Sequence, residues 1–286
     1  MRYFILVSLL LFTSAFHQLK DAKSYYESGM NHLKNRQFLP AIADFTHAIS
    51  MNARFKEAYL QRAKAKILLR EETELIAIKD IYSDLLKAKE LGDKEAFYFL
   101  WKKARTECYT LKAQLTSREE VYCLDYSRTN LKKFPVQINH HTSLLSLHLN
   151  HNQISRIGYF PVLKNLITLD ISNNALTSLP ANTHQLSALV ELNASFNQLK
   201  TLPYGIAQLK NLKALYLRSN RVEHIPATIR QLKSLEILDL SFNSLKKVPE
   251  GIESLKNLQA LYLFGNQIPE SEIELLKKKM PYTVIY

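Results

Sequence analysis

Leucine and isoleucine recur in a fixed frame along residues 121–268, and this frame predicts one short strand per repeat. Its clearest copy is LEILDLSFNSL at residues 235–245. In a neighbouring copy the alternation of period two turns Leu215 and Leu217 inward and leaves Tyr216 outward. A repeat in the twenties of residues predicts a solenoid, in which each unit buries its apolar face against its neighbours.

One asparagine marks each repeat, and it follows the predicted strand. The steps between successive copies are 22 or 23 residues, with Thr129 standing in the first position. An amide side chain donates and accepts at once, so it can satisfy backbone groups left open where the chain turns away from the strand. We therefore expect a structural ladder and not a binding site. The ladder comprises Asn152, Asn174, Asn197, Asn220, Asn243 and Asn266.

Before these repeats, residues 22–115 have a helical pattern rich in Lys, Glu, Leu and Ala. Pro40 suits the first position of a helix, where its missing N–H costs nothing. Gly92 and Asp93 indicate a helix stop followed by the N-cap of a last helix at about 94–115. The region is therefore expected to be all-helical.

The first fifteen residues contain one positive charge, then an apolar run, then small residues. This order is typical of a secretory signal peptide, which we predict over residues 1–17. The expected location is outside the cytosol: periplasmic, cell-surface or secreted. No later apolar stretch reaches spanning length, so no transmembrane segment is expected after cleavage. The alternatives are an uncleaved anchor or a buried N-terminal helix, and the latter would leave the protein cytoplasmic.

The composition is that of an ordinary globular protein, with 47% hydrophobic and 22% charged residues in a chain of 286. The net charge of +12 divides evenly, with +5 over residues 16–117 and +6 over residues 118–286. An even spread indicates solvated lysine faces and no dedicated basic arm. No zinc-finger spacing or aromatic stacking motif is present in the sequence, so a nucleic acid partner is not expected.

The frame LxxLxLxxNxL, continued as LxxLPxxIxxL after Asn174, resembles the leucine-rich repeat. The resemblance implies an α/β solenoid with a parallel sheet of seven repeats over residues 118–286. A C-terminal cap from about residue 269 should combine a short amphipathic helix with a closing strand.

The helical region, residues 18–117, resembles a tetratricopeptide repeat through Tyr25, Ser28 and Gly29, and through Phe45 on the next helix. A second, weaker unit departs from that pattern by an insertion around residues 70–74. The resemblance implies either a peptide-binding groove or a structural cap and spacer. With barely two units we favour the cap, because a long concave surface needs several repeats.

In leucine-rich-repeat proteins the outward residues of the strands line the concave face, where a partner protein binds. The alternative is that the Asp and Ser residues here are consensus filler, and Phe196 and Phe242 are expected to be packing residues of the turn. The residues that the resemblance places on the concave face are Asp125, His148, Asp170, Glu191, Asn193, Tyr216, Arg218, Asp239, Tyr262 and Phe264.

Candidate chemistry is sparse. No nucleophile elbow, phosphate loop, metalloprotease helix or kinase signature occurs in the sequence, so neither an enzyme nor a cofactor is expected. His140, His141, His148 and His151 cluster in the sequence, but we interpret them as surface residues and expect no metal site.

Cys108 and Cys123 are the only cysteines. They are candidates for a disulfide between the last helix and the first strand, as an exported chain permits. The alternative is that Cys123 points to the concave side, out of reach of Cys108.

The combined prediction is a non-enzymatic protein-protein interaction module that recognises another protein along the concave face. The alternatives are a cell-surface adhesion protein that binds matrix or glycan, and an intracellular signalling scaffold. Retention on polysaccharide with no captured protein would favour the first alternative, and an intact Met1 on the native protein would favour the second. The oligomeric state is not predicted.

Overall fold

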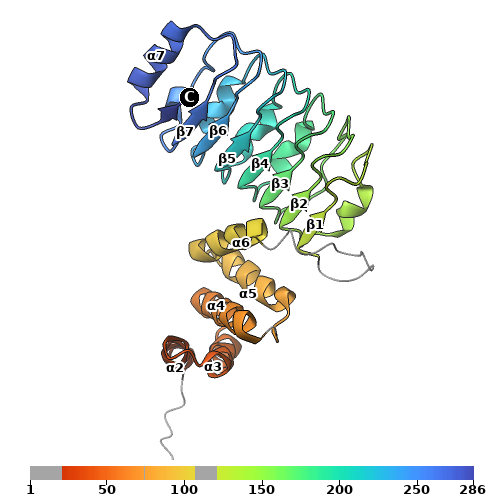
Figure 1. Ribbon diagram of the computed structural model, residues 1–286. Helices are drawn as coiled ribbons and strands as arrows, with labels where there is room; N and C mark the ends of the chain where they lie inside the picture. Colours follow the sequence, from red (N-terminus) through yellow and green to blue (C-terminus); the bar gives the residue numbers. More distant parts are fainter. Residues whose placement is uncertain (1–20, 74, 107–120) are drawn as a thin grey trace, which may run out of the picture. The chain divides into compact units, whose positions relative to one another are not determined.

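The structure is a computed structural model that describes residues 21–73, 75–106 and 121–286. The chain divides into two compact units, residues 1–100 and 101–286 (Figure 1). The predicted signal peptide, the predicted boundary at residue 117 and Cys108 lie outside the described residues. Those three expectations therefore stay predictions.

The first unit is helical, as the pattern predicts. Along the described chain α2 packs against α3, α3 against α4, and α4 against α5. The inserted residues around 70 lengthen α4 instead of forming a loop. The helices are α2 (Ala22–Lys34), α3 (Phe38–Met51), α4 (Lys56–Thr73), α5 (Ile78–Glu90) and α6 (Lys94–Thr106), of which α6 continues past the boundary at residue 100.

Two local predictions in this unit have different outcomes. Pro40 is the third residue of α3 and not the first, so the predicted start of that helix is wrong by two residues. The helix tolerates it because the N–H groups of the whole first turn lack intrahelical partners. The predicted cap of α6 is confirmed: Gly92 has a φ of +87°, and Asp93 Oδ1 accepts a hydrogen bond of 2.8 Å from the Ala96 amide.

A buried carboxylate joins α4 to α5. Arg62 Nε and Lys66 Nζ, one turn apart on α4, donate to Asp84 Oδ2 at 2.9 and 2.7 Å. Arg62 Nη2 also donates to Asp84 Oδ1 at 2.5 Å. Only 4% of the Asp84 side chain is exposed. A single acidic residue thus holds two cations at the interior of the helical unit.

The second unit is a parallel sheet of eight strands in sequence order (Figure 1). Equivalent residues of successive repeats pair directly, so Leu124, Leu147 and Leu169 stack beneath the sheet. The leucine-rich-repeat solenoid predicted from the frame is confirmed. The strands are β1 (Cys123–Asp125), β2 (Ser146–His148), β3 (Thr168–Asp170), β4 (Glu191–Asn193), β5 (Ala214–Tyr216), β6 (Ile237–Asp239), β7 (Ala260–Tyr262) and β8 (Val284–Ile285).

The asparagine column forms the ladder that the sequence predicts. Asn220 Nδ2 donates to the carbonyls of Leu217 and Ala194 at 2.9 and 3.0 Å, and its Oδ1 accepts from the Leu199 amide at 3.0 Å. One side chain therefore closes its own turn and joins it to the preceding repeat. The residue before each asparagine has a positive φ, as at Phe242 (+53°).

Short 3₁₀ helices return the chain behind the sheet in most repeats. They are η2 (Val136–His140), η3 (Ala181–Gln185), η4 (Tyr204–Gln208), η5 (Ala227–Gln231) and η6 (Ile252–Ser254). Between η2 and η3 the second repeat, which is fully described, crosses back without any helical turn.

A helix and a strand close the end of the solenoid, as predicted. Helix α7 (Glu270–Lys279) buries Leu276, and Met280 follows it into the same core. Strand β8 then pairs with β7 and covers the edge that β7 would otherwise expose.

Candidate functional site

One row of side chains crosses the exposed face of the sheet from β1 to β7, one residue per strand. The pairing register places Asp125 beside His148, His148 beside Asp170, and Tyr216 beside Asp239. Each of these residues is partly exposed. The predicted row is therefore a continuous file, although its first and last members stand at opposite ends of the repeats.

The acidic members of this row also have a local role. The side chains of Asp125, Asp170 and Asp239 accept hydrogen bonds of 2.8 to 2.9 Å from the amide two residues ahead. Asn193 does the same at 3.1 Å. Such Asx turns fix the chain where it leaves the strand. One oxygen of each of these side chains therefore already accepts a hydrogen bond within the protein, which leaves fewer acceptors for a partner.

His148 belongs to a small polar cluster at the N-terminal end of the row. Its Nε2 lies 3.0 Å from Ser146 Oγ, which in turn contacts Thr168 Oγ1. Burial lowers the pKa of His148, and the nearby carboxylates of Asp170 and Asp125 oppose that shift. Ser146 has no exposed surface. A serine beside a histidine can serve as a nucleophile, but this hydroxyl is enclosed and bonded to a threonine, so the cluster is structural.

Toward the C-terminal end, the row meets a group of aromatic rings around one arginine. The Arg218 guanidinium carbon lies 4.6 Å from the ring centroid of Phe242 and 5.3 Å from that of Phe264. Those two rings meet edge to face at 5.0 Å. Tyr262 stacks on Tyr286, with centroids 4.6 Å apart and planes within 5°. We call these five residues the aromatic cluster.

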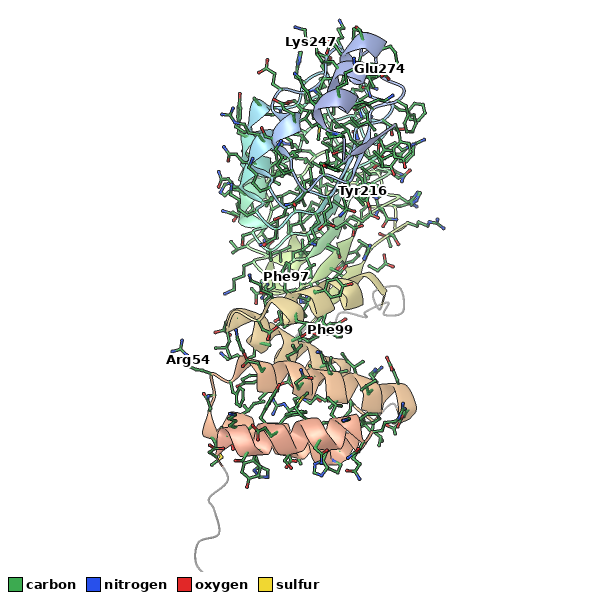
Figure 2. The ribbon with its side chains drawn as sticks, turned by 90° about the vertical axis from the view of Figure 1, so that its left-hand side faces the viewer. Arg54, Phe97, Phe99, Tyr216, Lys247 and Glu274 are labelled. Carbon is green, nitrogen blue, oxygen red and sulfur yellow. The ribbon has the colours of Figure 1, made fainter. Side chains whose placement is uncertain are left out.

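The aromatic cluster combines predicted and unpredicted residues. The interpretation of Phe242 as a turn-packing residue is incomplete, because 45% of it is exposed beside Arg218. Tyr286 comes from the cap and was missed. The sequence spacing predicts part of the aromatic cluster. Phe264 stands two repeats after Arg218, so both residues belong to one column of the sheet. Tyr216, labelled in Figure 2, lies on the neighbouring column.

The other candidate residues do not form a common site. His140 ends η2 and His141 follows it, whereas His148 lies on β2. Among the described residues no three His, Cys, Asp or Glu side chains gather as metal ligands would. Cys123 opens β1, and its predicted partner Cys108 is outside the described residues, so the bridge stays a prediction.

Comparison with protein families agrees with this geometry. A model of the leucine-rich repeat matches residues 207–268, and a model of two such repeats matches residues 142–184. The chain contains leucine-rich repeats, preceded by an N-terminal helical region. Proteins built on these repeats are typically non-enzymatic binding proteins, and the repeats suggest protein partners. In the described part of the chain, no helix has the length and apolar character needed to cross a membrane.

Curated relatives of this leucine-rich-repeat protein match only a segment of it. Lumican of Gallus gallus is 45% identical over 84 residues, which is 28% of this chain and 24% of lumican. Tsukushi of Xenopus tropicalis is 37% identical over 87 residues, 29% of this chain and 25% of Tsukushi. Leucine-rich repeat protein 1 of Mus musculus is 36% identical over 97 residues, 34% of this chain and 23% of its own length. The chain thus spans about a quarter of these relatives.

Two solved structures are similar over about half of the chain. A leucine-rich-repeat protein of Leptospira interrogans is 35% identical, with a TM-score of 0.44, and the match covers 53% of this chain and 45% of that one. An internalin of Listeria monocytogenes is 25% identical, with a TM-score of 0.47, and the match covers 54% and 44%.

Proposed function

We propose that this chain is an exported, non-enzymatic module that recognises another protein on the exposed face of its sheet. The observation that carries the proposal is the aromatic cluster, in which planar side chains and one arginine stand together on that face. Residues of this kind dominate the binding energy of protein interfaces, because they contribute area at low entropic cost.

The aromatic cluster is favoured over the acidic end of the row as the centre of the interface. The acidic side chains already accept hydrogen bonds from their own turns, whereas 39% of Phe264 and 54% of Tyr286 are exposed. The rings also hold Arg218 in place, since a cation above an aromatic face gains about 0.5–1 kcal/mol at an exposed site. A preorganised arginine loses less freedom when a partner binds.

Two further parts of the proposal rest on the sequence. Export is supported by the apolar run near the N-terminus, and Edman sequencing of the native protein tests the cleavage that it implies: a start near residue 18 supports a cleaved signal peptide, and an intact Met1 contradicts it. The helical unit is proposed as a tetratricopeptide-like cap. The closeness of Gly29 to Phe45 supports this, because a Cβ on Gly29 would lie 2.7 Å from Phe45 Cε1.

The test of the sheet face is a capture experiment with matched variants. The sheet variant changes Arg218→Ala, Phe242→Ser and Phe264→Ser together. The control variant removes two more exposed aromatic side chains outside the sheet, Tyr204→Ser and Tyr282→Ser, of which 78% and 95% are exposed. Each chain is immobilised and incubated with native lysate and envelope fractions, and thermal unfolding confirms that all three remain folded.

We expect partners that are captured by the native chain and by the control variant but lost with the sheet variant. Retention of the same partners by the sheet variant would contradict the proposed face. Retention of the native chain on polysaccharide, with no protein captured, would favour an adhesion role instead.

A further inference from the structure

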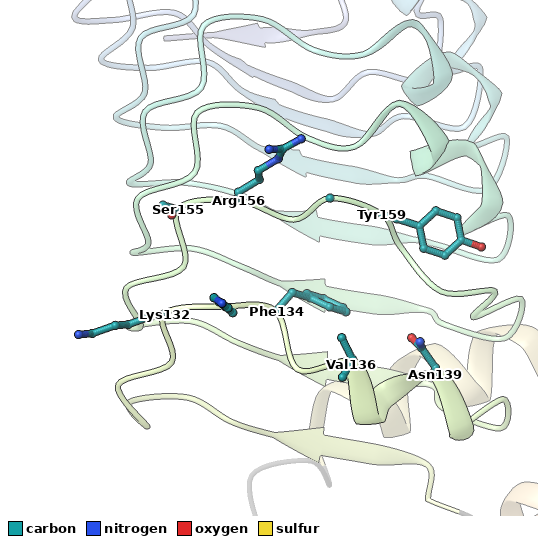
Figure 3. A pocket seen from close by; sticks show the side chains of 9 residues that line it. Lys132, Phe134, Val136, Asn139, Ser155, Arg156 and Tyr159 are labelled. Atoms are coloured by element: carbon teal, nitrogen blue, oxygen red, sulfur yellow. The ribbon is translucent and has the colours of Figure 1, made fainter.

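The second repeat leaves a pocket on the surface behind the sheet. This repeat is one residue shorter than the others, and Gly158 stands where four of the later repeats have the proline that precedes a 3₁₀ helix. A Cβ built on Gly158 meets nothing within 4 Å. The resulting pocket has a volume of about 650 Å³ (Figure 3). Its lining comprises Lys132, Lys133, Phe134, Val136, Asn139, Ser155, Arg156, Gly158 and Tyr159.

The walls of this pocket are held in place by the neighbouring repeats. Asn182 of the third repeat accepts from the Phe160 amide at 3.1 Å and donates to the Phe160 carbonyl at 2.8 Å. The Phe134 ring packs edge to face on the buried Phe160 ring, with centroids 6.0 Å apart. The pocket is therefore preformed, so a ligand would not need to order it.

Three cations line the pocket, and no carboxylate does. Lys132, Lys133 and Arg156 are exposed, and within the described part of the chain none of them forms an ion pair. Unpaired cations at the rim of a hollow attract an anion more strongly than the same charges on a flat surface, because the low-dielectric walls focus their field.

The distribution of charge along the repeats points to the same ligand. Residues 121–222 contain ten Lys and Arg but three Asp and Glu, whereas residues 223–286 contain eight of each. The three carboxylates, Asp125, Asp170 and Glu191, all lie on strands. The surplus of positive charge in the repeats is therefore concentrated in their first part, and the segments behind the sheet carry no acid there to neutralise it.

The pocket has two chemically different ends (Figure 3). Lys132 and Ser155 lie at one end, and Tyr159, Val136 and Asn139 lie at the other. Apolar surface is available at the second end, where 67% of Val136 and 55% of Tyr159 are exposed. We infer that this pocket is a second binding site, which takes an acidic peptide segment bearing an apolar side chain.

The apolar end decides for a peptide over a polyanion. A sulfated glycan or a nucleic acid backbone would satisfy the cations but would leave Val136 without a partner. An acidic segment followed by a leucine or phenylalanine would place carboxylates on the lysines and bury the valine and the tyrosine. The site lies behind the sheet, so it is independent of the face proposed above.

The repeats supply matched controls for testing this site. Lys246 and Lys247 occupy the positions in the sixth repeat that Lys132 and Lys133 occupy in the first, and Tyr204 occupies the position of Tyr159. Figure 2 places Lys247 near α7, at the far end of the solenoid. The pocket variants are Lys132→Ser with Lys133→Ser, and Tyr159→Ser; the controls are Lys246→Ser with Lys247→Ser, and Tyr204→Ser. All these side chains are exposed, so each variant should fold.

The probes are synthetic and labelled with fluorescein. One peptide has four glutamates followed by two leucines and a phenylalanine, a second has serines in place of these apolar residues, and the third probe is heparin. Fluorescence anisotropy at physiological ionic strength measures the affinity of the purified chain for each. We expect the apolar peptide to bind about tenfold less tightly to the pocket lysine variant and about fivefold less tightly to Tyr159→Ser, with both controls near the native affinity.

Four results would overturn the inference. Equal losses with the pocket pair and the control pair would indicate general attraction to a basic surface. Equal affinity for the apolar and serine peptides, or heparin binding that depends on the pocket lysines while no probe depends on Tyr159, would assign the site to a polyanion. No measurable binding of either peptide would remove the site.

Discussion

In the helical unit one carboxylate, Asp84, accepts from two cations on the neighbouring helix, whereas in the repeats one amide side chain recurs in six of the seven units. Both devices satisfy polar groups that the core would otherwise leave unpaired. They differ in how much depends on one residue. Asp84 joins two helices at one point, while the asparagine ladder divides the same task among six equivalent side chains.

The difference teaches where each unit is vulnerable. In a solenoid each repeat contacts only its neighbours, so damage at one repeat is shared by the two interfaces beside it. In the helical unit three hydrogen bonds meet at the one carboxylate of Asp84, so a single substitution removes all of them. Substitutions at the two kinds of site should therefore lower the free energy of unfolding by different amounts and affect different lengths of the chain.

The largest effect is expected from Asp84→Ala. It leaves Arg62 and Lys66 largely buried, with 16% and 14% of their side chains exposed, and without a carboxylate to balance their charges. Removing one partner of a buried pair costs about 3–5 kcal/mol. Hydrogen exchange of peptides from α4 and α5 should accelerate strongly, with the repeats unchanged.

The control for Asp84 is an exposed ion pair. Glu274→Ala removes the partner of Lys277, where 54% and 43% of the two side chains are exposed (Figure 2). Exposed pairs contribute little to stability, because solvent screens the two charges. An Asp84→Ala effect no larger than this control would show that the charged centre is dispensable.

An intermediate effect is expected from Asn220→Ala. The substitution leaves the Leu199 amide and the Ala194 carbonyl without the partner that the side chain supplies, at a cost of about 1–3 kcal/mol in the free energy of unfolding. Denaturant unfolding monitored by circular dichroism measures it. Asn211→Ala is the control, because Asn211 is exposed and its side chain donates one hydrogen bond, of 3.0 Å, to the Ser187 carbonyl. Equal losses for the two variants would contradict the structural role of the ladder.

The smallest effect is the dependence of the repeats on pH through His148. Burial lowers the pKa of this imidazole in the fold, so the unfolded chain takes up the proton first as the pH falls. Stability should be full above the unfolded pKa, about 6.5, and should decline as the pH falls from there toward the lower folded value. The melting temperature of the repeats should follow this decline, and His148→Gln should weaken it. His140→Gln, at an exposed position, should not.

Much of the repeat unit could be predicted, because its pattern is local and repeated. The strands, the asparagine ladder and the cap each follow from residues within one period. The aromatic cluster could be predicted only in part, since Tyr286 reaches Tyr262 from the cap and no periodicity links them. Asp84 was missed for a similar reason: its partners come from another helix, and a charged residue on a helix is usually a solvated one.

The pocket was not predicted, because the net charge was summed over all the repeats together. A net charge of +6 over residues 118–286 looks evenly spread, yet residues 223–286 are neutral by their own count. The spacing from Asn152 to Asn174 is 22 residues where the other spacings are 23. A single missing residue does not, however, show on which side of the solenoid a pocket forms.

The short second repeat has a consequence for how such proteins diversify and can be engineered. Because the strand and the asparagine of that repeat keep their register with both neighbours, the deletion is absorbed entirely by the return segment. A repeat protein can thus gain a surface pocket through the loss of one residue from a return segment, while the exposed face of its sheet is unaltered. Grafting residues 129–173, the two repeats that contain every lining residue, between regular repeats of a designed solenoid should carry the cavity with them.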